Sequence, residues 1–458
     1  MKYVEDLFTK LSARATAPVL FWRGREIVGE EFLDEVQAWR GSLRAHQVGA
    51  GTVCGFVGDY SPRACALMLA LMQAGAILVP FTRRAAKELP DLIRLATVER
   101  LIEFDAHDQA CFGPRRNFPV NPLVGQFRAT GHPGLIVFTS GSTGTPKAIL
   151  HDFARILNKY AQPRAAYRTL LFLLFDHFGG VNTFLSVLSF GGVAVIPMER
   201  TPGAIARLIE AAHIELLPVT PTFLRLLLAS GSNKGNDLSS VKLITYGTEM
   251  MPEPVLARLQ EAFPCARLQQ TYGLSEVGVL GSRSRESGSL WVRVGGAGFE
   301  TRVVDGVLHI RSEYAMVGYL NAPSPFDADG WMNTGDVVTQ EGEWLRFLGR
   351  ATDIINVGGQ KVFPGEVENV LIQADNVLDA TVYGEKHPLT GSIVVARVTL
   401  STPEDSIGLR QRLRAFCLSR LEPFKVPVRF LVTQSQPHSS RFKKSRPSSC
   451  EKPEISAR

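Results

Sequence analysis

The sequence predicts an α/β protein: a large, doubly wound N-terminal domain with a β-rich subdomain, followed by a small α+β C-terminal domain. Up to about residue 285, short apolar segments alternate with helical segments, as in a parallel sheet covered by helices. Short strands separated by Asp-Gly and Gly-Gly turns follow, and a strand–helix–strand pattern resumes after residue 351. We place the boundary at residues 349–352, which gives domains 1–350 and 351–458.

The composition is that of a soluble globular protein. The chain has 458 residues, of which 45% are hydrophobic and 21% charged, and it is too long for one compact core. The formal charge of +6 does not require a nucleic-acid partner. Six cysteines without a CxxC fit reduced thiols in the cytoplasm, and the acidic first residues interrupt the apolar core that a signal peptide needs. We expect a cytoplasmic protein that binds no nucleic acid.

Residues 169–197 are long and apolar enough to be mistaken for a membrane span. Asp176, His177 and two Gly-Gly pairs interrupt the segment, so we predict a strand at 170–175, a helix at 181–189 and a strand at 193–196 instead. We therefore expect no membrane span. Similar units of strand and helix are expected at 50–82, 135–160, 205–219 and 241–247.

The second half of the chain changes character. Hairpin-like segments at 292–313 and 331–350 predict the β-rich subdomain. The C-terminal domain is predicted from TDIINV, PGEVENVLIQA and DATVYGE, then a helix at 406–420 and a strand at 428–432. The Ser/Pro/Lys-rich segment after residue 436 is expected to be mobile.

The segment FTSGSTGTPK, residues 138–147, has the composition of an anion site. Its glycines let backbone N–H groups approach a ligand, its hydroxyls add donors, and Lys147 adds a positive charge. It does not fit the GxxxxGK[ST] spacing of a Walker A loop, and a flexible strand-to-helix connection is the alternative. FDHFGG and TYGTEM also follow predicted strands, and ligands of doubly wound sheets bind beyond the strand C-termini. This convergence favours a site.

Four segments carry a resemblance to a known family. FTSGSTGTPKA, TYGLSE (271–276), TGD (334–336) and GRATDIINVGGQKVFPGEVE (349–368) occur in this order. The series resembles the adenylate-forming (AMP-binding) superfamily of acyl- and aryl-CoA synthetases, peptide-synthetase adenylation domains and luciferases. The resemblance implies a mobile C-terminal lid and activation of a carboxylic acid by ATP as an acyl-adenylate, with release of pyrophosphate.

The resemblance also implies how ATP is held. Ser275 would contact a phosphate, and Glu276 would be the metal ligand for Mg²⁺. Tyr272 would stack on adenine, and Asp336 would accept from both ribose hydroxyls with Arg350 nearby. The adenine edge would face Gly247, Thr248 and Glu249. The phosphates would be bound by Thr139, Ser140, Gly141, Ser142, Thr143, Gly144 and Lys147.

The resemblance places the acid pocket around His177, Phe178 and Tyr246. Amino-acid-activating relatives use an aspartate in this region, and Asp176 could take that role. The register of FDHFGG instead places His177 in the pocket. We therefore favour an acid without an α-amino group, either an aryl acid or a medium acyl acid.

Two positions depart from the family pattern. Thr352 stands where a charged hinge residue is usual, and Lys443 aligns with the catalytic lysine although Phe442 replaces the usual glycine. Lys444 follows and could take the place of Lys443. Either lysine could reach the adenylate, or the adenylation step could be weak.

Three functional readings follow from these observations. The first is a ligase that transfers the acyl group to a phosphopantetheine thiol, of CoA or of a separate acyl carrier protein, favoured by GGQKV (358–362). The second is an adenylating enzyme with another acceptor such as an amine, including the amino-acid type. The third is a nucleotide-binding relative with weak or no catalysis, suggested only by the irregular C-terminus.

Overall fold

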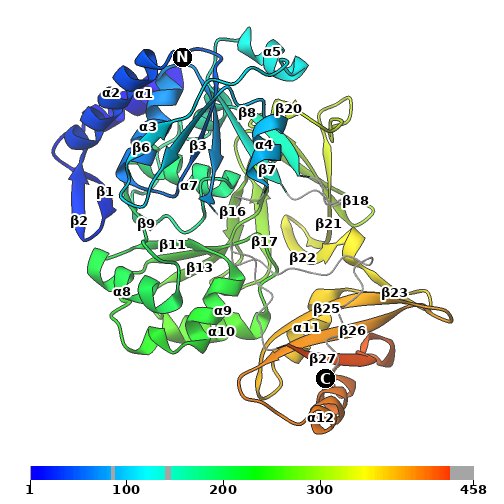
Figure 1. Cartoon of the computed structure of the whole chain (residues 1–458). Helices are drawn as coiled ribbons and strands as arrows, with labels where there is room; N and C mark the ends of the chain where they lie inside the picture. The colour runs from blue at the N-terminus through cyan, green and yellow to red at the C-terminus, as the bar shows by residue number, and fades with distance from the viewer. Residues whose placement is uncertain (1, 84–87, 140–145, 434–458) are drawn as a thin grey trace.

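The computed structural model describes residues 2–83, 88–139 and 146–433. The large domain contains two seven-stranded sheets with helices between and outside them (Figure 1). A six-stranded sheet follows in sequence, and the C-terminal domain has a sheet of its own. The predicted division into a large α/β domain with a β-rich part and a small α+β domain is confirmed at this level.

The first seven-stranded sheet is almost entirely parallel. Every neighbouring pair is parallel except β1 and β2. Its strands, in spatial order, are β13 (Arg267–Gln270), β12 (Leu243–Tyr246), β11 (Leu216–Val219), β9 (Arg168–Leu170), β10 (Val193–Val195), β1 (Pro18–Trp22) and β2 (Arg25–Val28).

The second seven-stranded sheet is mixed. Its four central strands are parallel, whereas the other three pair antiparallel with their neighbours. The spatial order is β20 (Gly318–Tyr319), β8 (Lys147–Asp152), β7 (Gly134–Thr139), β4 (Ile77–Phe81), β3 (Val53–Val57), β5 (Arg100–Phe104) and β6 (Ala110–Phe112).

Two apolar helices contribute to the core that both sheets share. Helix α3 (Pro62–Gln73) is buried from Ala64 to Met72, and the Ser61 side chain caps it by accepting from the Ala64 N–H at 3.0 Å. Helix α7 (Phe178–Ser189) packs in the same core and begins at the cap residue His177. The other helices of this domain are α1 (Lys2–Ser12), α2 (Gly29–Ala45), α4 (Leu89–Leu95), α5 (Pro122–Arg128), α6 (Phe153–Asn158), α8 (Pro202–Ala212), α9 (Pro221–Ala229) and α10 (Glu253–Ala262).

Two predicted units differ in the structure. The strand expected at 170–175 is β9, which ends at Leu170, and residues 171–177 form a loop. That loop is apolar because Leu171, Phe172 and Phe175 pack in the core, not because they belong to a strand. Residues 134–152 form the antiparallel hairpin β7–β8 rather than a strand leading into a helix, since the connection is too short for a crossover.

The β-rich part consists of antiparallel hairpins, as predicted. Its six-stranded sheet has the order β16 (Gly281–Ser284), β17 (Val292–Gly295), β22 (Trp344–Arg350), β21 (Met332–Glu341), β19 (Val307–Ser312) and β18 (Phe299–Val304). A short hairpin, β14 (Gly273–Leu274) and β15 (Gly278–Val279), precedes it and carries the TYGLSE segment.

The C-terminal domain has a separate hydrophobic core. The short turn η3 (Ala351–Asp353) connects it to β22. Its other elements are β23 (Ile355–Val357), β24 (Gln360–Val362), α11 (Pro364–Leu371), β25 (Val377–His387), β26 (Gly391–Leu400), α12 (Ser406–Leu418), η4 (Pro423–Lys425) and β27 (Arg429–Thr433). The expected helix at 406–420 and strand at 428–432 correspond to α12 and β27.

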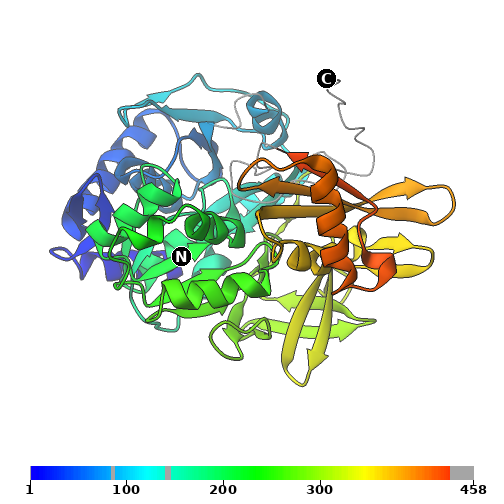
Figure 2. The ribbon, with the colours of Figure 1, turned by 90° about the horizontal axis from the view of Figure 1, so that it is seen from below.

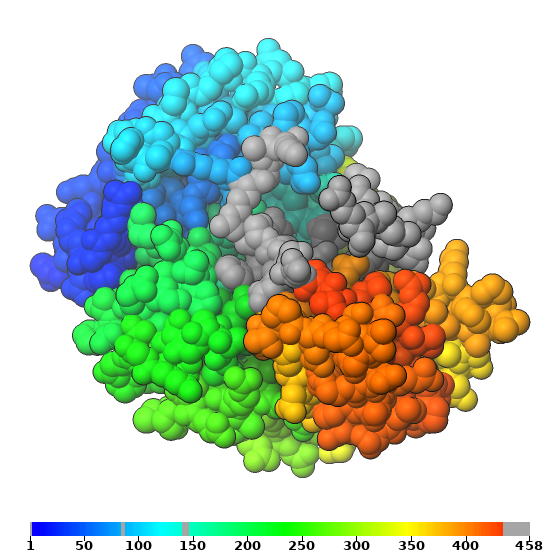
Figure 3. All heavy atoms as spheres, turned by 60° about the horizontal axis from the view of Figure 1, so that its bottom comes forward, coloured from blue at the N-terminus to red at the C-terminus, as the bar shows by residue number. Residues whose placement is uncertain are grey.

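The C-terminal domain packs beside the large domain, next to α9 and α10 (Figures 2 and 3). Arg225 of α9 forms an ion pair with Asp379 of β25, with an Nη1–Oδ1 distance of 2.5 Å. Both side chains are nearly buried, with 8% and 5% of their surface exposed. If the two domains moved apart by a small distance, each charge would remain buried without its partner, which is strongly destabilising. The ion pair therefore favours the observed arrangement of the two domains.

Candidate active site

Two adjoining cavities mark the candidate site. The inner cavity, about 570 Å³, is lined by residues within or shortly after β7, β9, β11, β12 and β13 and by α7. The interdomain cavity, about 350 Å³, lies between the large domain and α11. Thr248, Tyr272 and Arg350 line both, so the cavities meet at these residues. Ligands of such sheets bind at the carboxyl ends of the strands, and this is where the loops converge.

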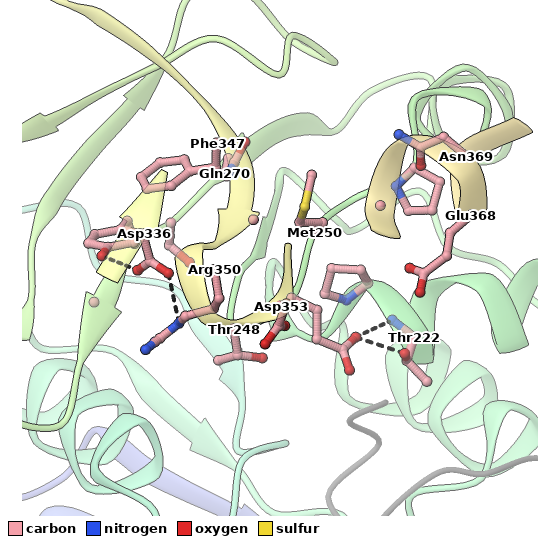
Figure 4. A pocket seen from close by; sticks show the side chains of 18 of the residues that line it. Thr222, Thr248, Met250, Gln270, Asp336, Phe347, Arg350, Asp353, Glu368 and Asn369 are labelled. Atoms are coloured by element: carbon pink, nitrogen blue, oxygen red, sulfur yellow. Dashed lines mark hydrogen bonds and ion pairs between the residues drawn. The ribbon is translucent and has the colours of Figure 1, made fainter. Parts of the chain in front are cut away.

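Asp336 is held in the interdomain cavity by two partners. The Tyr272 hydroxyl donates to one carboxylate oxygen at 2.5 Å, and the Arg350 Nε lies 2.8 Å from the other (Figure 4). Asp336 and Arg350 are register partners in the β21–β22 hairpin, which brings them together. Burial raises the pKa of Asp336, and Arg350 and the Tyr272 hydroxyl oppose that shift. The carboxylate is thus fixed in place at the cavity wall.

The Tyr272 ring has a partner that the sequence did not indicate. Phe347 of β22 stacks on it, with ring centroids 4.5 Å apart and the planes 17° from parallel. Both rings line the interdomain cavity. One face of Tyr272 is therefore covered by protein, and a flat ligand could stack only on the other face.

Residues 247–249, which follow β12, line the two cavities. A Cβ on Gly247 would lie 2.7 Å from the carbonyl oxygen of Thr271, so only glycine fits here, and Thr248 has a φ of 70°. The Glu249 carboxylate accepts from the N–H and hydroxyl of Thr222, at 3.2 and 2.7 Å. These bonds connect the segment to Thr222 at the start of α9 (Figure 4). Arg225 of the same helix pairs with Asp379 of the C-terminal domain.

Lys147, Ser275 and Glu276 line the inner cavity together. Tyr319 of β20 contacts two of them: its hydroxyl donates to the Glu276 carboxylate at 2.6 Å, and its ring lies 5.0 Å from the Lys147 ammonium. Burial and the Glu276 carboxylate raise the pKa of the Tyr319 hydroxyl, so it remains a donor. A positive charge and a carboxylate are thus presented side by side, which suits a metal-bound polyphosphate.

The three residues expected to form the acid pocket lie in different places. His177 and Phe178 line the inner cavity, and His177 Nδ1 accepts from the Gly179 N–H at 3.0 Å as the cap of α7. Tyr246 does not line it: only 1% of its surface is exposed, and it packs in the core with Phe223 and Leu259. Its neighbours Thr245 and Gly247 line the cavity instead, because successive side chains of a strand point to opposite faces.

Family models match both parts of the chain. The model of the AMP-binding enzyme matches residues 7–320, and that of the AMP-binding enzyme C-terminal domain matches residues 366–443. The chain belongs to the AMP-binding enzyme family. This confirms the resemblance that the four sequence segments carried.

Curated relatives of this AMP-binding enzyme are CoA ligases. A 3-[(3aS,4S,7aS)-7a-methyl-1,5-dioxo-octahydro-1H-inden-4-yl]propanoyl:CoA ligase of Mycobacterium tuberculosis is 30% identical, over 83% of this chain and 84% of the relative. An indoleacetate–CoA ligase of Aromatoleum aromaticum is 28% identical, over 79% and 81%. A crystal structure of an anthranilate CoA ligase with anthranoyl-AMP has a TM-score of 0.82 at 20% identity, covering 96% and 95%. The predicted class, an ATP-dependent acid–thiol ligase, is confirmed.

The donor set of this AMP-binding enzyme fits Mg²⁺ bound mainly through phosphates. Among residues 2–83, 88–139 and 146–433, no three His, Cys, Asp or Glu side chains cluster as a metal site. Among the described residues that line the inner cavity, Glu276 carries the single carboxylate, and Lys147 lines the same cavity. Magnesium commonly uses one or two carboxylates together with substrate phosphates, so a single carboxylate in the cavity is compatible with such an ion.

Several predicted residues cannot be placed. Thr139 ends β7 and lines the inner cavity, but Ser140, Gly141, Ser142, Thr143 and Gly144 lie outside the described residues, as do Lys443 and Lys444. Thr352 is exposed in η3, where its hydroxyl donates to Asp353 at 3.2 Å. None of the helices within residues 2–83, 88–139 and 146–433 combines the length and the hydrophobicity that a membrane span requires.

Tyr319→Phe tests whether the hydroxyl positions Glu276. Loss of a hydrogen bond to a carboxylate costs roughly 1.5–3 kcal/mol, so we expect about a tenfold or greater rise in the Mg²⁺ concentration needed for half-maximal pyrophosphate release. The thermal unfolding midpoint should change little. Tyr314→Phe is a matched control, a buried tyrosine outside both cavities. If both variants show the same Mg²⁺ dependence, the Tyr319 hydroxyl does not position Glu276 and the side chain contributes packing only.

Proposed function

We propose that this protein activates an aryl or medium acyl acid with ATP and transfers the acyl group to the thiol of CoA. A carboxylate oxygen of the acid would attack the α-phosphorus, the bond to the β-phosphate would break, and acyl-adenylate and pyrophosphate would form. The thiol would then attack the acyl carbonyl and release AMP. The observation that carries this proposal is the inner cavity, which is lined both by Lys147 and Glu276 and by the apolar side chains of Leu216 and Val219.

The residues of the two cavities would bind different parts of ATP and the acid. Asp336 would accept from the ribose hydroxyls, with the free face of Tyr272 against adenine and Gly247, Thr248 and Glu249 along its edge. The phosphates would lie against Lys147, Ser275 and the segment 139–144. Glu276 would hold Mg²⁺, which neutralises phosphate charge when bound. His177 and Phe178 would contact the acid.

The relatives support a ring-bearing acid. The Mycobacterium relative is named for a bicyclic dioxo propanoic acid, and the Aromatoleum relative for indoleacetic acid. In both, a ring carries the carboxyl group on a short chain. An inner cavity of about 570 Å³ has room for such an acid. We propose the same for this chain, which we also place in the cytoplasm.

Mass spectrometry identifies the acceptor. The protein is incubated with Mg·ATP and a panel of cyclic, aryl, fatty and amino acids, with CoA or a phosphopantetheinylated carrier protein. We expect an acyl-CoA from at least one ring-bearing acid. Acyl transfer to the carrier protein alone would replace CoA as the acceptor, and an adenylate trapped only by amines would contradict the thiol ligase.

Two single variants test which lysine near the C-terminus acts in adenylation. Lys443→Ala should reduce adenylation by about 100-fold or more, because an ammonium that stabilises charge only in the transition state acts on kcat. Thioester formation from a supplied acyl-adenylate should persist. If Lys444→Ala has this effect instead, the assignment is off by one residue. Wild-type adenylation in both variants would show that neither lysine acts in this step.

Thr352→Pro tests the proposed hinge between the domains. Thr352 lies in a 3₁₀ turn, whose φ is close to that of proline, so the variant should fold in the observed arrangement. A rotation of the C-terminal domain would need φ/ψ changes here that proline prevents. We expect pyrophosphate release to persist and thioester formation to fall. The assay measures both steps on one preparation, with circular dichroism and Thr352→Ala as controls. Equal loss of both steps would contradict a hinge at Thr352.

A further inference from the structure

Helix α7 presents a polar strip to the inner cavity. Asn182, Thr183 and Ser186 line the cavity, whereas Val181, Phe184 and Leu185 are buried in the core. The same cavity is also lined by Leu216, Pro218 and Val219. A purely hydrocarbon acid would leave polar groups of this strip without partners when it expels water. The hydrogen bonds that these side chains already make determine which of them can bind a ligand.

Two of the three polar side chains already use their single proton. The Thr183 hydroxyl donates to the Gly179 carbonyl at 2.8 Å, and the Ser186 hydroxyl donates to the Thr183 carbonyl at 2.8 Å. A hydroxyl has one O–H to give, so neither can donate to a ligand without breaking a bond within the helix. Neither side chain therefore offers a donor to the acid.

Asn182 differs because its two polar atoms have different surroundings. Its Oδ1 accepts from the Lys159 ammonium at 2.9 Å and from the Tyr160 hydroxyl at 2.8 Å. Burial lowers the pKa of Lys159 to about 7, and the ammonium that predominates below that pH has no acceptor capacity. The amide oxygen must then face Lys159. The amide NH₂ is left, with no hydrogen-bond partner in the described part of the chain.

The position of Asn182 places this donor away from the phosphate end. Phe178, at the start of α7, lies against the β14–β15 hairpin that carries Ser275 and Glu276: a Cβ on Gly278 would be 4.0 Å from its ring. Asn182 follows one helical turn later, about 6 Å further along the helix axis. An acid whose carboxylate is at the phosphate end would thus reach Asn182 with its remote part.

We infer that the Asn182 amide donates a hydrogen bond to an acceptor oxygen on the remote part of the substrate acid. This inference rests on the proposed function and narrows it to oxygen-bearing acids, of which ring ketones are the simplest. A donor that a bound acid shields from water needs an acceptor, so acids lacking the oxygen are disfavoured. Asn182 is then a specificity-determining residue, and Lys159 and Tyr160 fix its orientation.

Matched pairs of acids test the inference. Straight-chain and cyclohexyl carboxylic acids with a keto group at successive positions are compared with their parents lacking it, by pyrophosphate release at a pH below the Lys159 pKa. We expect at least one keto acid to exceed its parent in kcat/KM by about tenfold. Parents equal to or better than every keto acid would overturn the inference but leave the ligase. Release with no acid at all would overturn both.

The variant Asn182→Asp isolates the donor. The carboxylate keeps an acceptor for Lys159 and Tyr160, so the fold should persist, but it removes the NH₂. We expect the keto preference to fall to about twofold or less, and an acid with a hydroxyl at the same position to gain relative to the ketone. Ser186→Ala, which removes a hydroxyl bonded within the helix, should retain the keto preference. A keto preference unchanged in Asn182→Asp, or lost equally in Ser186→Ala, would overturn the assignment to Asn182.

Discussion

Asp336→Ala is expected to raise the KM for ATP by about 100-fold or more. The carboxylate would accept from two ribose hydroxyls, and each such charge-assisted bond contributes roughly 1.5–3 kcal/mol. Its two protein partners, the Tyr272 hydroxyl and the Arg350 guanidinium, hold it at the cavity wall before ATP binds. The fixed orientation means that little ordering is needed on binding, which makes the loss larger.

A second variant separates binding from local structure. Tyr272→Phe removes the hydroxyl that holds Asp336 but leaves both the carboxylate and the stacking ring. Its effect on the KM for ATP should be several-fold smaller than that of Asp336→Ala. The measurement is pyrophosphate release against ATP concentration, with thermal unfolding as a check on folding. An unchanged KM in a folded Asp336→Ala protein would assign TGD to turn formation only.

Glu276→Gln should lower kcat for pyrophosphate release by about 100-fold or more. The amide keeps an oxygen that can accept from the Tyr319 hydroxyl, so the local packing should survive. It lacks the negative charge that a hard divalent cation prefers, and removal of one electrostatic contact to a transition state typically costs about 100- to 1,000-fold. The Mg²⁺ requirement should rise at the same time.

The control for Glu276 is a carboxylate elsewhere in the same β-rich region. Glu300→Gln removes an exposed charge that pairs with Arg311 on the surface. Surface pairs of this kind contribute little, so pyrophosphate release and its Mg²⁺ dependence should remain those of the wild type. Wild-type kinetics in Glu276→Gln would contradict a metal-binding role of Glu276, and other oxygen atoms of the cavity would then have to bind the metal.

The sequence predicted well those features that short segments encode by themselves. The pair Asp336 and Arg350 follows from two segments that form one hairpin, so their spacing along the chain determines their contact. The α/β class follows from the apolar segments, and the C-terminal core from its strand–helix–strand pattern. Such local patterns require no knowledge of how distant parts of the chain meet.

Two kinds of feature were missed: the face of a strand on which a residue lies, and contacts between segments that are distant in the sequence. Tyr246 was expected in the acid pocket, but a shift of one residue along β12 exchanges the two faces, and Thr245 lines the cavity instead. Tyr319 contacts Glu276 across 43 positions of sequence, from an edge strand of another sheet. Phe347 covers one face of Tyr272 from β22. No spacing in the sequence could have indicated these contacts.

Acid-dependent release of pyrophosphate from Mg·ATP is the decisive test of whether this protein forms an acyl-adenylate. The wild-type chain is incubated with Mg·ATP and each acid of the panel, without CoA, and pyrophosphate is measured with the acyl-adenylate detected in parallel. We expect one equivalent of pyrophosphate per adenylate with at least one ring-bearing acid, and none without an acid. ATP binding with no pyrophosphate from any acid, or release that is independent of the acid, would contradict it.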